Sequence, residues 1–426
     1  MLKKKKIFFK KKILIYGLGK TGISSYIFLK KNNEVFVFDD NKKTSINKKN
    51  ILKSHFDYIL ISPGINIKKC FLKNYIKKNS KRIITDLDVF YSLYYKNINI
   101  SITGTNGKST TAKILFHILK DQKKDVRLVG NIGNAILNEK RISEKTIFVI
   151  EVSSYQIEYS NNFNANYAAI LNISPDHLER HGNLNNYVKA KFKLVKNQTN
   201  KDYVFFDINN KYIQKFLNKN KLNSKIINVS KKSYLKEIHK IKNPYFYTDG
   251  NRENLRFIFS IANKLKLKKK YLFKTINRFK GLNFRQQIIY NSKKLTVIND
   301  SKATSFSSSI NILKSLKQVY WLVGGIPKSG DRFFMTKKQC LNFKAYIYGK
   351  NKNYFIKELK NKLRYEYFDN LQNALKKIIF EIKSQKINLH STILFSPSAA
   401  SFDTYKNFEE RGKKFNQLLK NFNLKK

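Results

Sequence analysis

The segment ISITGTNGKSTTAK, residues 100–113, is the feature that most constrains how this chain can fold. An apolar, β-rich run ends at Thr103, and apolar residues recur with helical spacing from Ile114 onward. A glycine-rich turn between a strand and a helix favours phosphate oxygens, because backbone N–H groups and the helix dipole point at them. Only two residues separate Gly104 from Gly107, whereas the glycines of the usual P-loop lie further apart. The segment is therefore open to three interpretations: a phosphate loop that has lost its usual form, a chance similarity, or the loop of a different nucleotide-binding family.

A second glycine-rich turn lies near the start of the chain. Gly17, Gly19 and Gly22 follow the strand-like run KILIYG, and Asp39 ends the next such run. This is the order of residues in the dinucleotide fingerprint. The turn is open to three interpretations: a nicotinamide-dependent reductase, another nucleotide whose diphosphate lies at the helix N-terminus, or a turn without a ligand. Nothing downstream resembles a hydride-transfer site, which disfavours the first.

Strand-like and helix-like runs alternate along the whole chain. This alternation predicts an α/β protein with parallel sheets throughout. At 426 residues the chain is too long for one ordinary core. We expect a Rossmann-like domain over residues 1–96, a P-loop-type mononucleotide-binding ATPase domain over residues 97–281, and a second Rossmann-like domain over residues 282–426.

The formal net charge of +58 suggests a different class of function, a basic protein that binds nucleic acid. The lysines are spread over the whole chain and no zinc-finger or RNP-type motif accompanies them, so we expect no obligatory nucleic-acid partner. Apolar runs fall short of the roughly 18 residues needed to span a bilayer. Cys70 and Cys340 are too few for a disulfide framework. We therefore expect a cytoplasmic protein without a membrane partner. We also expect a monomer.

Polar residues end two further apolar runs of the central block. TIFVIEVSSYQIE places Glu151 at a strand end, where a carboxylate beside a phosphate loop is a natural magnesium ligand. AAILNISPDHLERHG places His177 after the next strand, at the same edge of the sheet. YVKAKFKLV contains three alternating lysines, Lys189, Lys191 and Lys193, and position alone predicts that all three are solvated.

Four motifs in this order, GTNGKST, EVSSYQIE, LNISPDHLERHG and YVKAKFKLV, resemble the Mur ligase family of peptidoglycan synthesis. The short phosphate loop is the form that this family has. The runs GNRENL, FKGLNFRQQ, VINDSKATS, WLVGGIPKSGD and SPSAASFDTYKNFEERG extend the resemblance over essentially the whole chain. They are most similar to the branch that adds D-glutamate to UDP-N-acetylmuramoyl-L-alanine. Another amino-acid-adding branch is the alternative within the family.

The resemblance implies an ATP-dependent, amide-forming ligase that works through an acyl phosphate. Lys108, His177 and Lys191 match the family's catalytic positions. Two magnesium ions are implied, with Ser109, Glu151, His177 and Lys191 as ligands. Lys191 would carry a carbamate derived from CO₂, because an unmodified ammonium would repel magnesium and a carbamate offers it an anionic oxygen.

The resemblance also implies three groups of binding residues. Those for ATP are Gly104, Thr105, Asn106, Gly107, Lys108, Ser109, Thr110, Asn251, Asn254, Arg285, Asp300 and Lys302. Those for the UDP substrate are Lys20, Thr21, Ser62, Gly64, Asn131 and His177. Those for D-glutamate are Thr304, Lys328, Ser401, Phe402 and Phe408. The first glycine-rich turn would then hold a UDP diphosphate, with no nicotinamide involved.

Overall fold

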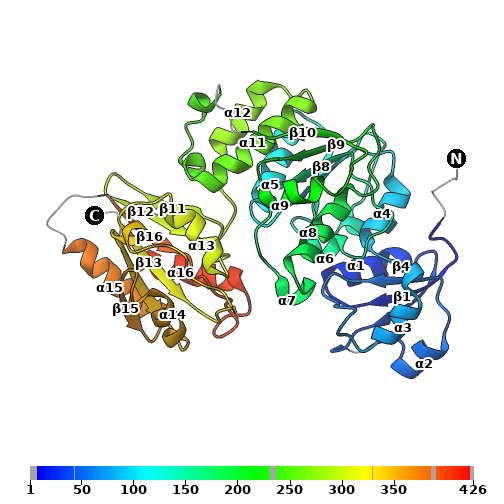
Figure 1. The fold of residues 1–426 in the computed structure, drawn as a ribbon, viewed down its shortest axis with the longest axis horizontal. Helices are drawn as coiled ribbons and strands as arrows, with labels where there is room; N and C mark the ends of the chain where they lie inside the picture. The colour runs from blue at the N-terminus through cyan, green and yellow to red at the C-terminus, as the bar shows by residue number, and fades with distance from the viewer. Residues whose placement is uncertain (1–6, 43, 231–236, 329, 385–389, 423–426) are drawn as a thin grey trace. The chain divides into compact units, whose positions relative to one another are not determined.

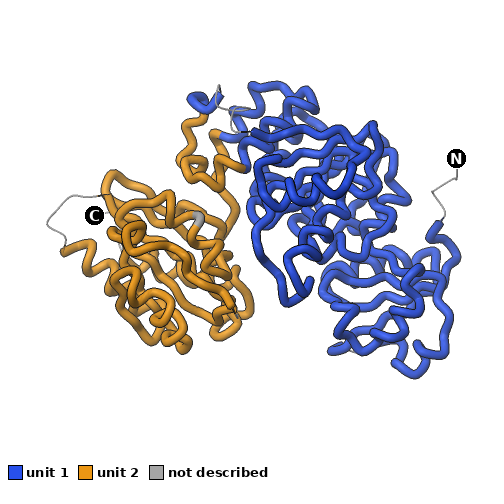
Figure 2. The backbone as a smooth tube through the Cα atoms, in the orientation of Figure 1, with its two compact units in different colours: residues 1–240, 254–276 blue, residues 241–253, 277–426 orange. Residues whose placement is uncertain are grey.

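The computed structural model describes residues 7–42, 44–230, 237–328, 330–384 and 390–422. The described chain forms three separate sheets with helices around each (Figure 1). It divides into two compact units, residues 1–240 with 254–276 and residues 241–253 with 277–426 (Figure 2). The first unit contains two of the sheets and the second unit contains the third. The bounds expected for three domains stay a prediction.

The first sheet has the strand order β2-β1-β3-β4, with every pair parallel. Its central strand has the sequence KILIY, a run of β-branched and aromatic residues that suits a buried strand. The chain reverses its winding direction beside β1, so the glycine-rich turn after β1 lies at the edge where such sheets bind ligands. The elements are β1 (Lys12–Tyr16), α1 (Lys20–Leu29), β2 (Glu34–Phe38), α2 (Lys48–Lys53), β3 (Tyr58–Ile61), α3 (Lys73–Lys78), β4 (Ile83–Ile84) and α4 (Asp86–Tyr94).

The second sheet has the order β10-β9-β8-β5-β7-β6 and is parallel throughout. Because β8, β5 and β7 are neighbours, the loops that follow their carboxyl ends meet at one edge. Its strands are β5 (Asn99–Thr103), β6 (Val126–Gly130), β7 (Ile147–Glu151), β8 (Tyr167–Ile170), β9 (Tyr203–Phe206) and β10 (Lys225–Asn228). The described α-helices between β5 and β11 are α5 (Lys108–Asp121), α6 (Ser154–Ile157), α7 (Leu178–His181), α8 (Leu184–Phe192), α9 (Lys211–Leu217), α11 (Asp249–Lys264) and α12 (Lys269–Arg278).

The third sheet has the order β11-β12-β16-β13-β14-β15. Here the expectation of parallel sheets throughout is wrong, because β11 pairs antiparallel to β12. The turn between them is too short for the crossover that a parallel pair needs. The elements are β11 (Gln287–Asn291), β12 (Leu295–Asn299), α13 (Phe306–Leu313), β13 (Val319–Gly324), β14 (Phe343–Tyr348), α14 (Lys352–Leu359), β15 (Arg364–Phe368), α15 (Leu371–Lys383), β16 (Ser391–Phe395) and α16 (Phe408–Lys420).

One continuous apolar core joins the first two sheets, which explains why they form a single compact unit. It contains Ile13 and Leu60 of the first sheet and Phe148 and Ile170 of the second. The ring of Phe90 on α4 packs edge-on against Phe148 with 4.7 Å between centroids. The third sheet has a separate core on each of its two faces.

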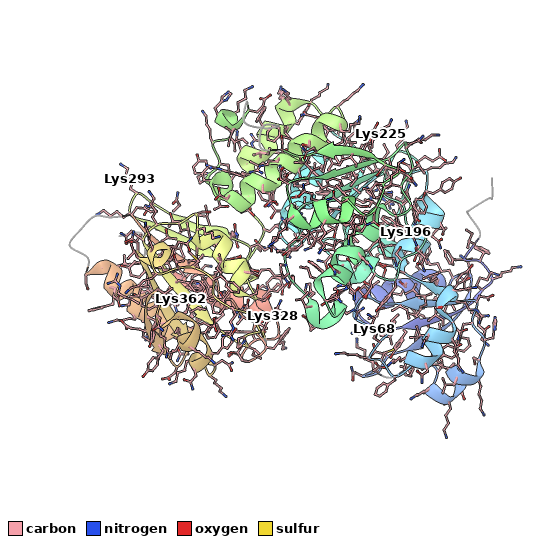
Figure 3. All side chains as sticks on the ribbon, viewed as in Figure 1. Lys68, Lys196, Lys225, Lys293, Lys328 and Lys362 are labelled. Atoms are coloured by element: carbon pink, nitrogen blue, oxygen red, sulfur yellow. The ribbon has the colours of Figure 1, made fainter. Side chains whose placement is uncertain are left out.

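The lysines are distributed over all three sheets and their helices, as the sequence indicates (Figure 3). The labelled side chains illustrate this. Lys68 follows β3, Lys196 and Lys225 belong to the second sheet region, and Lys293, Lys328 and Lys362 belong to the third.

Candidate active site

The short phosphate loop begins α5 at Gly107, which has a left-handed φ of 83°. A Cβ atom at this position would lie 1.9 Å from Oδ1 of Asn254, a buried residue of α11. Only glycine fits both the backbone conformation and the space. The structure therefore brings together the loop and Asn254, two parts of the predicted ATP site that are far apart in the sequence.

The phosphate loop is hydrogen-bonded to the segment that follows β8. The backbone N–H of Thr105 donates to the carbonyl of Asn172 at 2.9 Å, and that of Asn106 donates to the Asn172 side chain at 2.8 Å. The Thr105 hydroxyl accepts from the Ser174 N–H at 3.1 Å and contacts the Tyr187 hydroxyl at 3.1 Å. Sequence reasoning did not single out Asn172 or Tyr187, although both lie inside the motifs that carried the resemblance.

Two lysines meet on one carbonyl oxygen of this loop. The Nζ atoms of Lys108 and Lys191 each donate to Gly104 O at 2.8 Å. Burial, followed by the nearby charge of Lys108, lowers the pKa of Lys191 well below its ordinary value. The side chain of Lys191 is almost fully buried, so the expectation that it is solvated is wrong. In the helix α8 residues two positions apart point to different sides, so Lys189 is exposed where Lys191 is buried. Lys193 follows the helix and is partly buried.

Glu151 and Ser109 present buried oxygens that could hold a cation. Glu151 is 1% exposed at the end of β7, and Asn131 donates to its Oε1 at 2.7 Å. Its Oε2 and the Oγ of Ser109 have no hydrogen-bond partner among the described residues. A buried carboxylate oxygen without a donor is costly, and a bound cation removes that cost. Asn131 thus contacts Glu151, and its role toward the UDP substrate stays a prediction.

His177 ends the loop after β8 in a left-handed conformation with a φ of 53°. This conformation costs a non-glycine residue about 1 kcal/mol. Nδ1 and the Tyr155 hydroxyl share a hydrogen bond of 3.0 Å, and Nε2 lies 3.3 Å from Oδ2 of Asp176. Burial raises the pKa of Tyr155 to about 12, so this phenol keeps its proton. The charge of Asp176 acts to raise the pKa of Lys191, but burial and the charge of Lys108 lower it by more.

The described residues contain no group of three or more His, Cys, Asp and Glu side chains that could hold a metal ion. The ligand set that the sequence implies is of a different kind. It combines one carboxylate and one imidazole with a hydroxyl and a modified lysine, so the two metal sites stay a prediction.

Asp39, the acidic residue that follows β2, stabilises the first glycine-rich turn through hydrogen bonds. The carboxylate of Asp39 accepts from the backbone N–H of Leu18 at 2.6 Å and of Asn41 at 3.0 Å. Burial raises the pKa of Asp39, but these N–H donors outweigh it and the net shift is downward. The Ser62 hydroxyl donates to Gly17 O at 2.6 Å.

The other residues predicted to bind the UDP substrate differ in their burial and in their contacts. Nζ of Lys20 donates to Gly133 O at 2.9 Å, which joins the first glycine-rich turn to the loop after β6. Thr21 is partly buried, and Gly64 is exposed with open space around it.

Among the residues of the second unit that are predicted to bind the nucleotide, Asp300 is a buried carboxyl with several hydrogen bonds. Its carboxylate accepts from the Gln286 N–H at 3.1 Å and from the Ser396 hydroxyl at 2.9 Å. Burial raises the pKa of Asp300 to about 7, against these donors and the charge of Arg285. The amide of Asn251 donates to Gln286 Oε1 at 3.2 Å, so Gln286 links two predicted residues.

The residues predicted for D-glutamate gather at the carboxyl ends of β12, β13 and β16. Ile326 and Ala400 pair through N–H···O bonds of 2.9 and 2.8 Å, which places the segment with Lys328 beside the segment with Ser401. Nζ of Lys302 lies 4.0 Å from the ring centre of Phe408. The remaining two, Thr304 and Phe402, lie in the loops after β12 and β16, and Phe402 is exposed.

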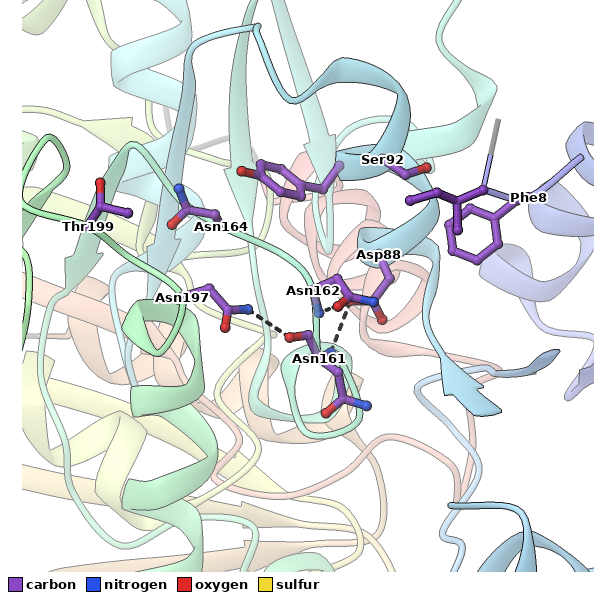
Figure 4. Close-up of a pocket in the computed structure, with 10 residues that line it drawn as sticks. Phe8, Asp88, Ser92, Asn161, Asn162, Asn164, Asn197 and Thr199 are labelled. Carbon is purple, nitrogen blue, oxygen red and sulfur yellow. Dashed lines mark hydrogen bonds between the residues drawn. The ribbon is translucent and has the colours of Figure 1, made fainter. Parts of the chain in front are cut away.

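A cavity of about 410 Å³ in the first unit lies apart from these residues (Figure 4). Its polar lining includes Asp88, whose carboxylate accepts from the Ser160 hydroxyl and from the N–H groups of Asn161 and Asn162. The carboxylate is therefore occupied in holding this loop. None of the predicted site residues lines the cavity, which is bounded by Ile7, Phe8, Asp88, Tyr91, Ser92, Asn161, Asn162, Asn164, Asn197 and Thr199.

Comparison with known families and structures agrees with this geometry. Residues 102–272 match the Mur ligase middle domain. The chain is similar over nearly its full length to solved Mur ligases. One is MurF from Thermotoga maritima in complex with ADP, with a TM-score of 0.59, 14% identity, and coverage of 99% of this chain and 97% of that one. Another is the UDP-N-acetylmuramate-alanine ligase MurC from the same organism, with a TM-score of 0.55, 16% identity, and coverage of 96% and 99%. These likenesses confirm the α/β fold class.

No helix in the described ranges of the chain has the length and apolar character needed to span a membrane.

Two relatives of this chain are both UDP-N-acetylmuramoylalanine–D-glutamate ligases. That of Rickettsia prowazekii is 33% identical, covering 96% of this chain and 98% of the relative. That of Francisella tularensis subsp. novicida is 34% identical, covering 96% and 95%. With this identity over nearly the whole of both chains, the chain belongs to the Mur ligase family.

Proposed function

We propose that this chain uses ATP to join D-glutamate to UDP-N-acetylmuramoyl-L-alanine, a step in making the peptidoglycan precursor. The observation that carries the proposal is the full-length similarity to ligases of that name. We also propose that the enzyme is cytoplasmic. We expect it to act as a monomer.

The reaction makes an amide from a carboxylate, which is a poor electrophile. A carboxylate oxygen of the substrate's L-alanine attacks the γ-phosphorus of ATP, the bond to the bridging oxygen breaks, and ADP leaves. The amine of D-glutamate then attacks the acyl carbon, phosphate leaves, and the nitrogen loses a proton to solvent. Phosphoryl transfer of this kind needs positioning and charge neutralisation more than covalent help from the protein.

The loop at residues 104–110 is suited to hold the ATP phosphates. Its N–H groups lie at the start of α5, and Gly107 lets the backbone come close. Nζ of Lys108 contacts the carbonyls of Gly104 and Thr105 at 2.8 Å, and rotation of this flexible side chain would place its charge on the terminal phosphates. In the second unit Asn251, Arg285, Asp300 and Lys302 are the proposed nucleotide contacts.

The donor set at the edge of β8, β5 and β7 fits magnesium. Ser109 and Glu151 would hold one ion through the oxygens that lack partners among the described residues, and His177 with Lys191 would hold the other. When bound, magnesium neutralises charge that develops on the phosphate oxygens.

Lys191 would act as a carbamate. Its neutral amine adds to the carbon of CO₂ and releases one proton, which turns a buried neutral amine into an anionic oxygen ligand. Its position beside Lys108 favours an anion at that point, because the ammonium of Lys108 lies on the same carbonyl.

The amino-acid substrate is a dicarboxylate and needs several donors. The ammonium of Lys328 and the hydroxyls of Thr304 and Ser401 would supply them, with the backbone at Phe402 and the ring of Phe408 alongside. Lys20, Thr21, Ser62, Gly64 and Asn131 are the proposed contacts to the UDP substrate.

The test is ADP release by the purified protein with Mg²⁺, ATP and UDP-N-acetylmuramoyl-L-alanine. D-glutamate is compared with L-glutamate, L-alanine, glycine and L-lysine. The proposal expects release only with D-glutamate. Release with another of these amino acids would move the chain to a sister branch. Absence of release together with tight, salt-sensitive binding to DNA or RNA would overturn the proposal in favour of a nucleic-acid-binding protein.

A further inference from the structure

Arg411 on α16 is a fully buried cation, with 1% of its surface exposed. Its guanidinium donates to backbone carbonyls and a hydroxyl, and its charge also acts on the buried carboxyl of Asp300. Its Nη1 has no hydrogen-bond partner among the described residues. An apolar side chain of similar size would often be more stable at such a place. The groups to which the guanidinium donates therefore indicate what this arginine contributes.

Two of the three loops that carry the predicted C-terminal site residues bond to this guanidinium. Nε donates to the Ser301 hydroxyl at 3.1 Å, and Nη2 donates to the carbonyl of Ser301 at 2.7 Å and to that of Ala399 at 2.9 Å. Ser301 follows β12 and Ala399 follows β16. The Ser301 hydroxyl also donates to the Phe408 carbonyl at 2.9 Å, so the start of α16 is tied in as well.

The third loop, after β13, packs against the same group. A Cβ atom at Gly325 would lie 3.0 Å from Nη1 of Arg411 and 2.4 Å from Ala400 O. Gly325 also has a φ of +120°, which an L side chain rarely adopts. The loop can approach the guanidinium because this residue is glycine.

We propose that Arg411 is a positioning residue that fixes these three loops relative to one another, and so sets the spacing between the nucleotide contacts and the D-glutamate contacts. Asp300 and Lys302 belong to the first loop, Lys328 to the loop after β13, and Ser401 to the loop after β16. A guanidinium suits this task because its planar fork reaches two carbonyls at once, whereas an ammonium offers a point charge on a flexible stem. The proposal rests on the function proposed above for these contacts.

The test compares Arg411→Lys, which keeps the charge and loses the fork, with the wild-type protein. The KM values for D-glutamate and for ATP should each rise on the order of tenfold to a hundredfold, because small displacements of binding groups have effects of this size. The KM for UDP-N-acetylmuramoyl-L-alanine should not change, since its proposed contacts belong to the first unit. Lys414→Gln is the matched control, because Lys414 is exposed on the same helix and should leave all three KM values unchanged.

A second readout does not depend on activity. Hydrogen exchange followed by mass spectrometry should show that residues 300–305, 325–328 and 399–405 lose protection together in Arg411→Lys. Ser301→Ala removes only the hydroxyl and should give the same exchange pattern more weakly, so the test survives if Arg411→Lys does not fold.

The outcomes separate the two proposals. Wild-type protein without D-glutamate-dependent ADP release would overturn the proposed function, while joint loss of protection in the three loops would still support the role of Arg411. Unchanged exchange in the three loops would overturn that role. That role would also be overturned by a lower kcat and a lower melting temperature with all three KM values unchanged. This is the result expected if Arg411 only stabilised the fold.

Discussion

Replacing Gly107 by alanine tests the geometry of the phosphate loop directly. Alanine at a φ of +83° costs about 1–2 kcal/mol from the backbone alone. The new Cβ would also lie 1.9 Å from Asn254 Oδ1, and ordinary contact begins at 3.4 Å, so the loop or Asn254 must move by about 1.5 Å. Asn254 is buried on α11 and cannot simply rotate into solvent. We therefore expect the loop to move.

A shift of this size should reduce kcat/KM for ATP on the order of a hundredfold. The free energy of unfolding should fall by at least the backbone cost, about 1–2 kcal/mol. ADP release with D-glutamate as the acceptor measures the first quantity, and urea unfolding followed by circular dichroism measures the second.

Gly250→Ala is the matched control for this change. Gly250 lies on the same helix as Asn254, and a Cβ there meets nothing within 4 Å. We expect unchanged kinetics and a stability that is equal or higher by up to about 1 kcal/mol. Wild-type kinetics in Gly107→Ala would refute the reasoning, because the close approach of the loop to Asn254 would then have no consequence.

Three further changes test other parts of the site and the fold. Lys191→Ala should abolish ligation, and short carboxylic acids should restore part of it by replacing the carbamate; unchanged activity would exclude the role in metal binding. Glu151→Gln should leave the melting temperature without ligands equal or higher, because a buried charge is removed, and should lose the stabilisation by Mg²⁺ with ATP that differential scanning fluorimetry measures in the wild type. Asp86→Asn should reduce the pH dependence of stability, because burial raises the pKa of this carboxyl from 3.8 to about 7. The native state then keeps a proton that the unfolded chain has lost, so stability falls as pH rises from 3.8 to about 7, and Asn should gain up to about 4 kcal/mol over Asp between pH 4 and pH 8. Urea titrations at both pH values measure this gain, and an equal difference between the two proteins at both would contradict it.

The order of the strands within each sheet explains why motifs that are separate in the sequence predict a single site. Each of Lys108, Glu151 and His177 follows or ends an apolar strand, and this is visible in the sequence. The sheet order then makes β8, β5 and β7 adjacent, so the loops that carry the three residues lie at one edge of the sheet. The same holds for β12, β16 and β13 in the third sheet.

Position along the chain could not reveal which lysine is buried. Lys189, Lys191 and Lys193 look equivalent in YVKAKFKLV, and the expectation from position was that all three are solvated. Burial of Lys191 depends on Tyr187 and on the carbonyl of Gly104, which is distant in sequence. The antiparallel pairing of β11 with β12 was missed because alternation of strands and helices says nothing of a short hairpin at a sheet edge.

The sequence by itself determined the chemical groups and their order: a short glycine loop with a lysine, a carboxylate and a histidine at strand ends, and a serine- and phenylalanine-rich run near the C-terminus. These are local properties, set by spacing and by the residue types that strands, turns and helix starts require. Only the tertiary structure decided that Asn254 lies against Gly107 and that Glu151 Oε2 is buried. It also decided that Arg411 donates to the loops after β12 and β16 and lies beside the loop after β13. The physical reason is that burial, hydrogen-bond satisfaction and steric contact depend on segments separated by many residues, and those segments become neighbours only when the sheets form.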